Sequence, residues 1–230
     1  MRILVIGATG GTGREVVREA LARGYQVNAL ARSAADAAPL LPGADIIEGD
    51  ARDAEAVAKA LAGCDGVISA LGTKLALLHK ETLLSAATRI LINEMQKQGI
   101  TRLVCITGIG AGDSRGHGGF LYDHIVQPLL LRSTYHDKDR QEDEIRKSGL
   151  DWTIVRPALL TDGPATGNIR ALTDLTDFHG GSIARADVAR FLITELEERH
   201  WAGRSPLIAS ADLAASIGIT NARQGLGDAR

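Results

Sequence analysis

Met1-Arg-Ile-Leu-Val-Ile-Gly-Ala-Thr-Gly-Gly-Thr-Gly13 is the stretch that decides the fold of this chain. Its apolar run, Ile3 to Ile6, predicts a buried strand that leads directly into glycines 7, 10 and 13, and an amphipathic helical pattern follows. Gly7 allows a tight turn, Gly10 lets backbone amides approach a ligand, and Gly13 lets the helix pack closely on the strand. A strand, a glycine turn and a helix N-terminus in this order bind pyrophosphate. The sequence therefore predicts a dinucleotide site, to which Thr9, Gly11 and Thr12 also contribute.

Composition restricts the possible partners of this chain. The 230 residues are 45% hydrophobic and 23% charged, which is ordinary for a globular domain with a sizeable core. A net charge of −2 gives no electrostatic reason to expect nucleic acid or an anionic membrane as partner. Oligomeric state is left open between monomer and homodimer.

Cysteine usage and the N-terminus predict a cytoplasmic protein. Cys64 and Cys105 are far apart in apolar stretches, without the spacing of a metal site or a redox motif, so both are expected to be reduced core residues. No apolar run reaches the length of a transmembrane helix, and the N-terminus does not have the pattern of a signal peptide.

Strand and helix patterns alternate along the chain, which predicts an α/β fold with a doubly wound, Rossmann-like parallel sheet. The expected domain covers residues 1–210, including a small C-terminal substrate-side region, and the tail 211–230 is expected to be weakly ordered. Strands are expected at 3–6, 27–31, 44–48, 66–71, 102–107, 152–156 and 206–209. Helices are expected at 15–23, 54–61, 81–97, 121–147 with a break at Pro128, and 186–197; residues 108–119 and 158–182 are expected to be loops, with an extended piece around 168–171.

The end of the second strand favours NADP(H) over NAD(H). An acidic residue normally stands there and bonds the ribose 2′-hydroxyl, but this chain has Arg32 and Ser33. A guanidinium can hold a 2′-phosphate bidentately, and the serine hydroxyl can donate as well. The alternative is a solvated arginine at a strand end.

Two further strand ends are candidates for cofactor contacts. Asp50 and Ala51 follow the third strand, where the sheet meets adenine, although Asp50 could equally belong to the turn before a helix N-cap at Asp53. Leu71, Gly72 and Thr73 end the fourth strand, where the sheet meets the cofactor's ribose and pyrophosphate, and a glycine there permits close backbone approach.

These motifs together resemble a known family. Gly7-Ala-Thr-Gly-Gly-Thr-Gly13, Ala31-Arg-Ser33, Gly49-Asp50 and Ser148-Gly-Leu-Asp-Trp-Thr-Ile-Val-Arg-Pro157 are similar to an atypical short-chain dehydrogenase/reductase. Within it, the chain resembles the NAD(P)H-binding group that includes flavin reductase/biliverdin reductase B-like enzymes and NmrA-like regulators. The resemblance covers residues 1–210 and implies that Pro157, Ala158 and Leu159 lie against the nicotinamide.

The wider family uses a serine after the fifth strand and a Tyr-x-x-x-Lys pair as its proton-transfer group. Here Gly108 stands at the serine position, and Thr134 stands four residues before Lys138. Tyr135 is three residues before the lysine, which rotates it by about 100° around the helix, away from the lysine's face. The pair is therefore not intact. Lys138 is expected to hold the nicotinamide ribose, with a surface ion pair to Glu142 as the alternative.

The missing pair shapes the expected reaction. The resemblance implies hydride transfer from NADPH to a flavin, quinone or similar planar acceptor, with the proton taken from water and Thr107 bonding the nicotinamide amide or the acceptor. An NmrA-like sensor that binds NADP(H) without turnover is the alternative. A nucleotide-sugar epimerase or dehydratase is a weaker one, because it needs an acid or base at the reacting centre.

Two other patterns are set aside. Residues 112–116 match the Gly-x-Ser-x-Gly elbow of hydrolases, but they do not link a strand directly to a helix. The histidines at 117, 124, 136 and 179 lack metal-site spacing, so no metal is expected; any of them is a proton donor only if the fold brings it to the nicotinamide.

Overall fold

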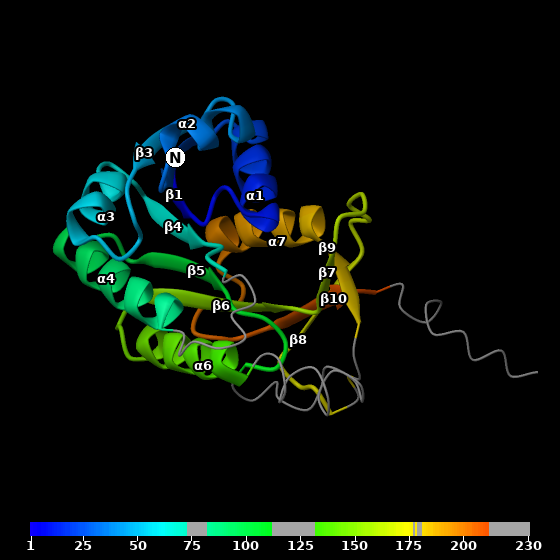
Figure 1. Ribbon diagram of the computed structural model, residues 1–230. Helices are drawn as coiled ribbons and strands as arrows, with labels where there is room; N and C mark the ends of the chain where they lie inside the picture. The colour runs from blue at the N-terminus through cyan, green and yellow to red at the C-terminus, as the bar shows by residue number, and fades with distance from the viewer. Residues whose placement is uncertain (73–81, 112–131, 177, 179–180, 212–230) are drawn as a thin grey trace, which may run out of the picture.

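The computed structural model describes residues 1–72, 82–111, 132–176, 178 and 181–211 (Figure 1). The strands are β1 (Arg2–Ile6), β2 (Gln26–Ala31), β3 (Asp45–Glu48), β4 (Gly66–Ser69), β5 (Arg102–Ile106), β6 (Asp151–Pro157), β7 (Leu159–Thr161), β8 (Ile169–Leu172), β9 (Ser182–Ala184) and β10 (Leu207–Ser210). The helices are α1 (Gly11–Ala22), α2 (Ala34–Ala37), the short 3-10 helix η1 (Ala38–Leu40), α3 (Ala54–Leu61), α4 (Leu83–Lys97), α6 (Arg132–Arg146) and α7 (Arg185–Glu198).

One mixed sheet organises the described part of the chain. Its strand order is β3-β2-β1-β4-β5-β6-β10-β8, and all its pairs are parallel except β10 with β8. The order reverses between β1 and β4, and the crevice at the carboxyl ends of strands beside such a reversal is where open α/β sheets bind ligands. The short strands β7 and β9 form a separate parallel pair. The doubly wound Rossmann-like fold in a single domain is confirmed.

Helices cover both faces of the sheet (Figure 1). Helices α1 and α7 pack on one face around a core that includes Val5, Val16 and Leu192, whereas α3, α4 and α6 pack on the other. The strands between them are apolar because both faces are buried. Cys64 and Cys105 lie buried in the second core as free thiols, as expected. No helix in the described ranges is long and apolar enough to cross a bilayer.

A buried carboxylate fixes α6 against α4. Asp137 is fully buried and accepts hydrogen bonds from the backbone N of Leu84 at 2.8 Å and of Ser85 at 3.3 Å. Thr82, the N-cap residue of α4, makes no side-chain capping bond, so a carboxylate from another helix supplies the cap. The neighbouring residue Lys138 is thereby held in a defined position beside the sheet.

Some elements differ from the sequence-based expectation. Helix α1 begins at Gly11 instead of Glu15, because extended Gly10 is its N-cap and the glycines join its first turn. Strands β7 and β9 were not predicted; they are three residues long and are held by pairing with each other. Residues 121–131 of the predicted long helix, with Pro128, and residues 212–230 of the predicted tail lie outside the described residues.

Candidate functional site

The glycine turn after β1 presents unused backbone donors. Gly10 N donates to Gly7 O at 3.0 Å, which closes the turn, and Arg14 N donates to Gly10 O at 2.9 Å, which starts α1. No side chain caps this helix, and its first turn contains no acidic residue. The first amides of α1, Gly11 to Gly13, therefore have no intrahelical acceptor and suit an anionic ligand.

Two glycines of this turn, Gly7 and Gly13, cannot be replaced without moving the backbone. A Cβ at Gly13 would lie 2.1 Å from Gly7 O, and a Cβ at Gly7 would lie 2.5 Å from Ala70 O, the residue that follows β4. Gly7 also has a φ of +77°, which L side chains rarely adopt. The turn after β1 thus touches the segment after β4, and the free amides at the start of α1 suit a pyrophosphate.

The segment that follows β4 has open space at Gly72. A Cβ at Gly72 would meet nothing within 4 Å, which leaves room for close approach of a ligand to this backbone. Leu71 is partly buried against the core on the face of the sheet that α3, α4 and α6 cover. Thr73, the third predicted contact here, lies outside the described residues.

Arg32 and Ser33 lie together after β2, where the adenosine ribose is expected. Arg32 is exposed. Ser33 is the N-cap of α2, and its hydroxyl oxygen accepts a hydrogen bond from Asp36 N at 3.2 Å. An accepting hydroxyl keeps its proton, so this cap is compatible with donation to a 2′-phosphate.

Asp50 holds the turn after β3. Its carboxylate accepts bonds from Arg52 Nε at 3.0 Å and Nη2 at 2.9 Å, and its backbone oxygen accepts from Asp53 N at 2.9 Å. The hydrogen bond from the Arg52 side chain is the main reason that the pKa of Asp50 falls to about 2. The geometry favours the turn role left open for Asp50; Ala51 beside it is partly buried against the core.

Lys138 stands at the carboxyl end of β5. Its Nζ lies 3.1 Å from where a Cβ of Gly108 would be, and Gly108 has a φ of +132°. The ammonium thus occupies the space beside the position where the family has a serine. The Tyr135 ring lies 4.9 Å from Nζ, while the Tyr135 hydroxyl donates to Ile109 O at 2.7 Å. The tyrosine was expected to point away, but residues three apart are neighbours on a helix, so only its hydroxyl is turned elsewhere.

Burial lowers the pKa of Lys138 to about 8, against the opposing effect of the Glu142 charge. A lysine with this pKa exchanges its proton near neutral pH, which an ordinary surface lysine does not do. Among the described residues at the carboxyl end of β5, Lys138 is therefore the polar group that is suited to donating a proton.

Glu142 is buried at the centre of a charged network and is not a surface partner of Lys138. Its carboxylate accepts from Arg156 Nε at 3.0 Å and Nη2 at 2.7 Å, and from Arg146 Nη2 at 2.7 Å. The Thr107 hydroxyl donates to the same carboxylate at 2.7 Å. Because Thr107 gives its proton to Glu142, its oxygen faces a ligand only as an acceptor. The network joins the ends of β5 and β6 to α6.

Pro157 ends β6, and the two residues after it differ in exposure. Ala158 is buried, whereas Leu159 is 66% exposed at the start of β7. His136 is exposed on α6. The Gly-x-Ser-x-Gly stretch and the histidines at 117, 124 and 179 lie outside the described residues.

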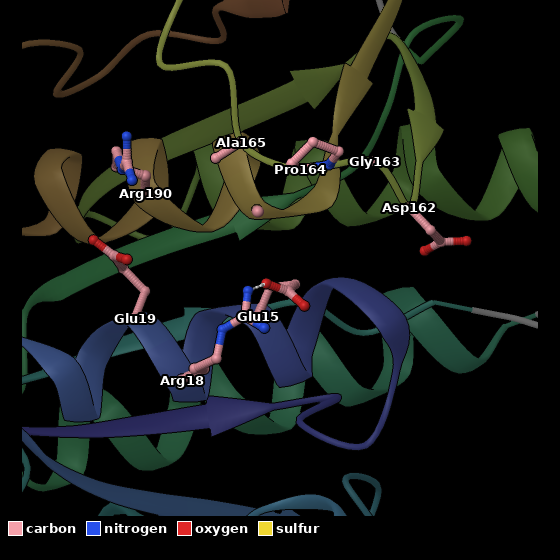
Figure 2. Close-up of a pocket in the computed structure, with 9 residues that line it drawn as sticks. Glu15, Arg18, Glu19, Asp162, Gly163, Pro164, Ala165 and Arg190 are labelled. Carbon is pink, nitrogen blue, oxygen red and sulfur yellow. Dashed lines mark hydrogen bonds and ion pairs between the residues drawn. The ribbon is translucent and has the colours of Figure 1, made fainter.

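A polar hollow of about 510 Å³ lies beside the glycine turn, between α1 and α7 (Figure 2). Charged side chains surround it, with Glu15, Arg18 and Glu19 from α1 and Arg190 from α7, and the loop from Asp162 to Ala165 covers one side. Its lining contains no aromatic residue and none of the turn glycines, so it is a poor surface for a planar acceptor.

Two arginines at the crevice formed by the carboxyl ends of the strands were not singled out from the sequence. Arg52 is held by Asp50 near Arg32, and Arg185, the first residue of α7, lies against Gly11 of the glycine turn. Arg52 is held by a local contact within the turn after β3, whereas Arg185 reaches Gly11 through a tertiary contact that no spacing rule predicts.

With this geometry established, comparisons with known proteins identify the family. Residues 7–199 match the family described as NAD(P)H-binding. The chain belongs to this NAD(P)H-binding family. The predicted membership in an NAD(P)H-binding group is confirmed, and so is a nicotinamide dinucleotide as the cofactor class.

Relatives of this NAD(P)H-binding protein carry different names. An anaerobillin reductase, ChuY, from Escherichia coli O157:H7 has a solved structure that is 29% identical, with a TM-score of 0.77 over 93% of this chain and 98% of its own. An uncharacterized sugar epimerase, YhfK, of Bacillus subtilis is 28% identical over 89% of this chain and 92% of its own. The photosystem II assembly factor Ycf39 of Synechocystis is 34% identical over 71% of this chain and 46% of its own.

Proposed function

We propose that this protein is an NADPH-dependent reductase whose acceptor is a flavin, a quinone or a similar planar conjugated compound, a bilin included. One observation carries the proposal: the hydroxyl of Tyr135 is bonded to Ile109, while Lys138 Nζ lies at Gly108, at the carboxyl end of β5. The family's tyrosine acid is thus replaced by a lysine. Similarity to a protein named as a reductase supports the same reading.

The chain's own residues suit a bound NADPH. The amides of Gly11 to Gly13 bind the pyrophosphate, with the rest of the turn, Gly7 to Gly10, shaping it. Arg32 and Ser33 bind the 2′-phosphate, and Ala51 lies toward the adenine, beside the turn that Asp50 holds. Leu71 and Gly72 line the ribose and pyrophosphate, and Pro157, Ala158 and Leu159 line the nicotinamide, which supplies a hydride when bound. Buried thiols fit a cytoplasmic location, which is part of the proposal.

Lys138 and Thr107 have different polar roles at the nicotinamide end of the site. The Thr107 oxygen accepts from the nicotinamide amide, since its proton goes to Glu142. Lys138 Nζ hydrogen-bonds the nicotinamide ribose and gives a proton to the heteroatom of the acceptor that gains negative charge on reduction. Water returns the proton to the amine. The lysine thereby replaces the direct protonation by water that the sequence alone suggests.

A second candidate is an NADP(H)-sensing regulator without turnover. The engaged Tyr135 hydroxyl suits it as well, and relatives named as assembly factors support it. A sugar epimerase, the name of another relative, is weaker. It would need acid–base chemistry on a sugar, for which the described residues offer Lys138 alone near the reacting end.

Oxidation of NADPH and NADH by the purified protein, with flavins, quinones and a bilin as acceptors, tests the reductase proposal. Sustained NADPH oxidation with one acceptor class is the expected result. Tight NADPH binding without turnover for every class would instead favour the sensor.

Arg32→Ala is expected to weaken NADPH binding about 10-fold, because one charge-assisted contact to the 2′-phosphate is lost, and to leave NADH binding unchanged. Equilibrium titration of nucleotide fluorescence measures both. Exposed Arg14, on the first turn of α1, is the matched control, for which no difference between the two nucleotides is expected. An equal loss for NADH and NADPH in Arg32→Ala would contradict the 2′-phosphate assignment.

A further inference from the structure

Arg185 lies against the glycine turn from a distant part of the chain. It is the first residue of α7, and a Cβ at Gly11 would lie 2.8 Å from Arg185 Nε and 3.0 Å from its Cδ. Gly11 is not one of the three glycines of the turn motif at 7, 10 and 13, and it does not have the positive φ that restricts Gly7. The space that Gly11 leaves is the space that the arginine fills.

The charge of Arg185 is poorly balanced by the protein itself. A cation in the first turn of a helix is unfavourable because the helix N-terminus is already electropositive. Its ion pair is with Asp162, at 2.6 Å between Nη1 and Oδ1, and the Asp162 side chain is 89% exposed. The buried carboxylate in the same first turn, Asp187, instead accepts bonds from Thr166 and Gly167.

We propose that Arg185 is a cofactor-binding residue that neutralises the pyrophosphate, with Asp162 as its replaceable partner in the free protein. Two features point to this role: the side chain lies beside the unused amides of α1, and its present partner is an exposed carboxylate, which a ligand can replace at little cost. A phosphate oxygen accepts stronger, charge-assisted bonds from a guanidinium. The inference rests on dinucleotide binding, which the family establishes, and not on the reductase activity.

Asp162 also links the cofactor turn to the far end of the crevice. It follows β7, whose first residue, Leu159, is the last of the segment proposed to line the nicotinamide. Figure 2 shows Asp162 beyond Gly163, near the first turn of α1. β9, which pairs with β7, leads directly into Arg185. The small β7–β9 sheet is therefore fastened to the glycine turn by the arginine.

The test is equilibrium binding of NADPH and NADH to the full chain, without any acceptor. Arg185→Gln is expected to weaken both nucleotides by about the same factor, roughly 10- to 30-fold, because both contain the pyrophosphate. Arg32→Ala, by contrast, affects NADPH alone. Asp162→Asn is expected to tighten both nucleotides about 2- to 4-fold, since it removes the competing carboxylate. Arg185→Lys, which keeps the charge without the planar fork, is expected to lie between wild type and Arg185→Gln.

Gly11→Ala provides an independent check. Its methyl group is expected to displace the guanidinium and to weaken both nucleotides, with no further loss when it is added to Arg185→Gln. If the fold losses of affinity caused by Gly11→Ala and Arg185→Gln multiply in the double variant, the methyl group acts on the nucleotide directly. That result would contradict the proposal that both substitutions act through the guanidinium. If Arg185→Gln binds like wild type, or if Arg185→Gln and Asp162→Asn change affinity in the same direction, the pair is structural and the proposal is wrong. A wild-type protein that binds neither nucleotide would overturn this proposal and the reductase together.

Discussion

Glu142→Ala is expected to lower the free energy of unfolding by about 3–5 kcal/mol, because it leaves the buried guanidinium of Arg156 without its bidentate partner. Both side chains are almost wholly buried, at 0% and 1% exposure, so water cannot replace the lost bonds. The Thr107 hydroxyl loses its acceptor as well. Denaturant unfolding at pH 7 measures the difference, with the same dependence of the unfolding free energy on denaturant concentration for wild type and variant.

Glu144→Ala on the same helix is the matched control. Glu144 pairs with Arg89 on the surface, where an ion pair contributes about 0–1 kcal/mol, so little change in stability is expected. The double variant E142L R156M should recover much of the loss. Replacing both partners of a buried ion pair by apolar groups leaves no unpaired buried charge, whereas replacing one partner does. A Glu142→Ala protein within about 1 kcal/mol of wild type would show that the carboxylate is not paired as the structure has it.

The pH dependence of this effect has a defined sign. Burial raises the pKa of Glu142, but the hydrogen bonds and charges of Arg156, with those of Thr107 and Arg146, lower it by more, so the net shift is downward. The stabilisation is therefore complete above the unfolded-state pKa, about 4.3, and is lost as the pH falls through the folded-state pKa. The difference in the free energy of unfolding between wild type and Glu142→Ala should therefore become smaller in acid.

Lys138→Met is expected to lower kcat/KM with the best acceptor by about 100-fold, the usual contribution of a positioned proton donor. In the wild type, kcat/KM should fall as the pH rises through about 8, where the ammonium loses its proton. Glu142 and Cys105 are the titratable groups that face Lys138, Glu142 being the charged one, and the Tyr135 ring packs against it. Burial raises the pKa of Cys105 to about 12, which keeps it neutral in this range. The inflection near pH 8 should be absent from Lys138→Met.

Lys138→Arg separates proton transfer from charge. Its guanidinium stays protonated, so the variant should be slow but without a fall above pH 8. If Lys138→Met raises only the KM for NADPH and leaves kcat unchanged, the lysine holds the ribose without giving a proton. If the inflection persists at its wild-type position, the proton comes from another group and the assignment to Lys138 fails.

Local pattern was enough to predict the fold and the cofactor class. The strand, glycine turn and helix at the N-terminus require only neighbouring residues, and the apolar strands after them identify a sheet buried on both faces. Helix α3 has the predicted bounds, 54–61, because its N-cap Asp53 and its apolar face both lie within the segment. Family membership agrees with that reading.

Tertiary structure alone decided the chemistry at the two ends of the crevice. Thr107, Glu142 and Arg156 are far apart in sequence, and no spacing rule joins a strand end to the middle of a helix, yet they form one buried network. Lys138 acquires its low pKa from burial, which a sequence does not display. Arg185 reaches Gly11 because α1 and α7 pack on the same face of the sheet. The sequence by itself determined that this protein binds a dinucleotide, since that depends on local backbone geometry. Which side chains stand around the dinucleotide was decided by packing between elements that are distant along the chain.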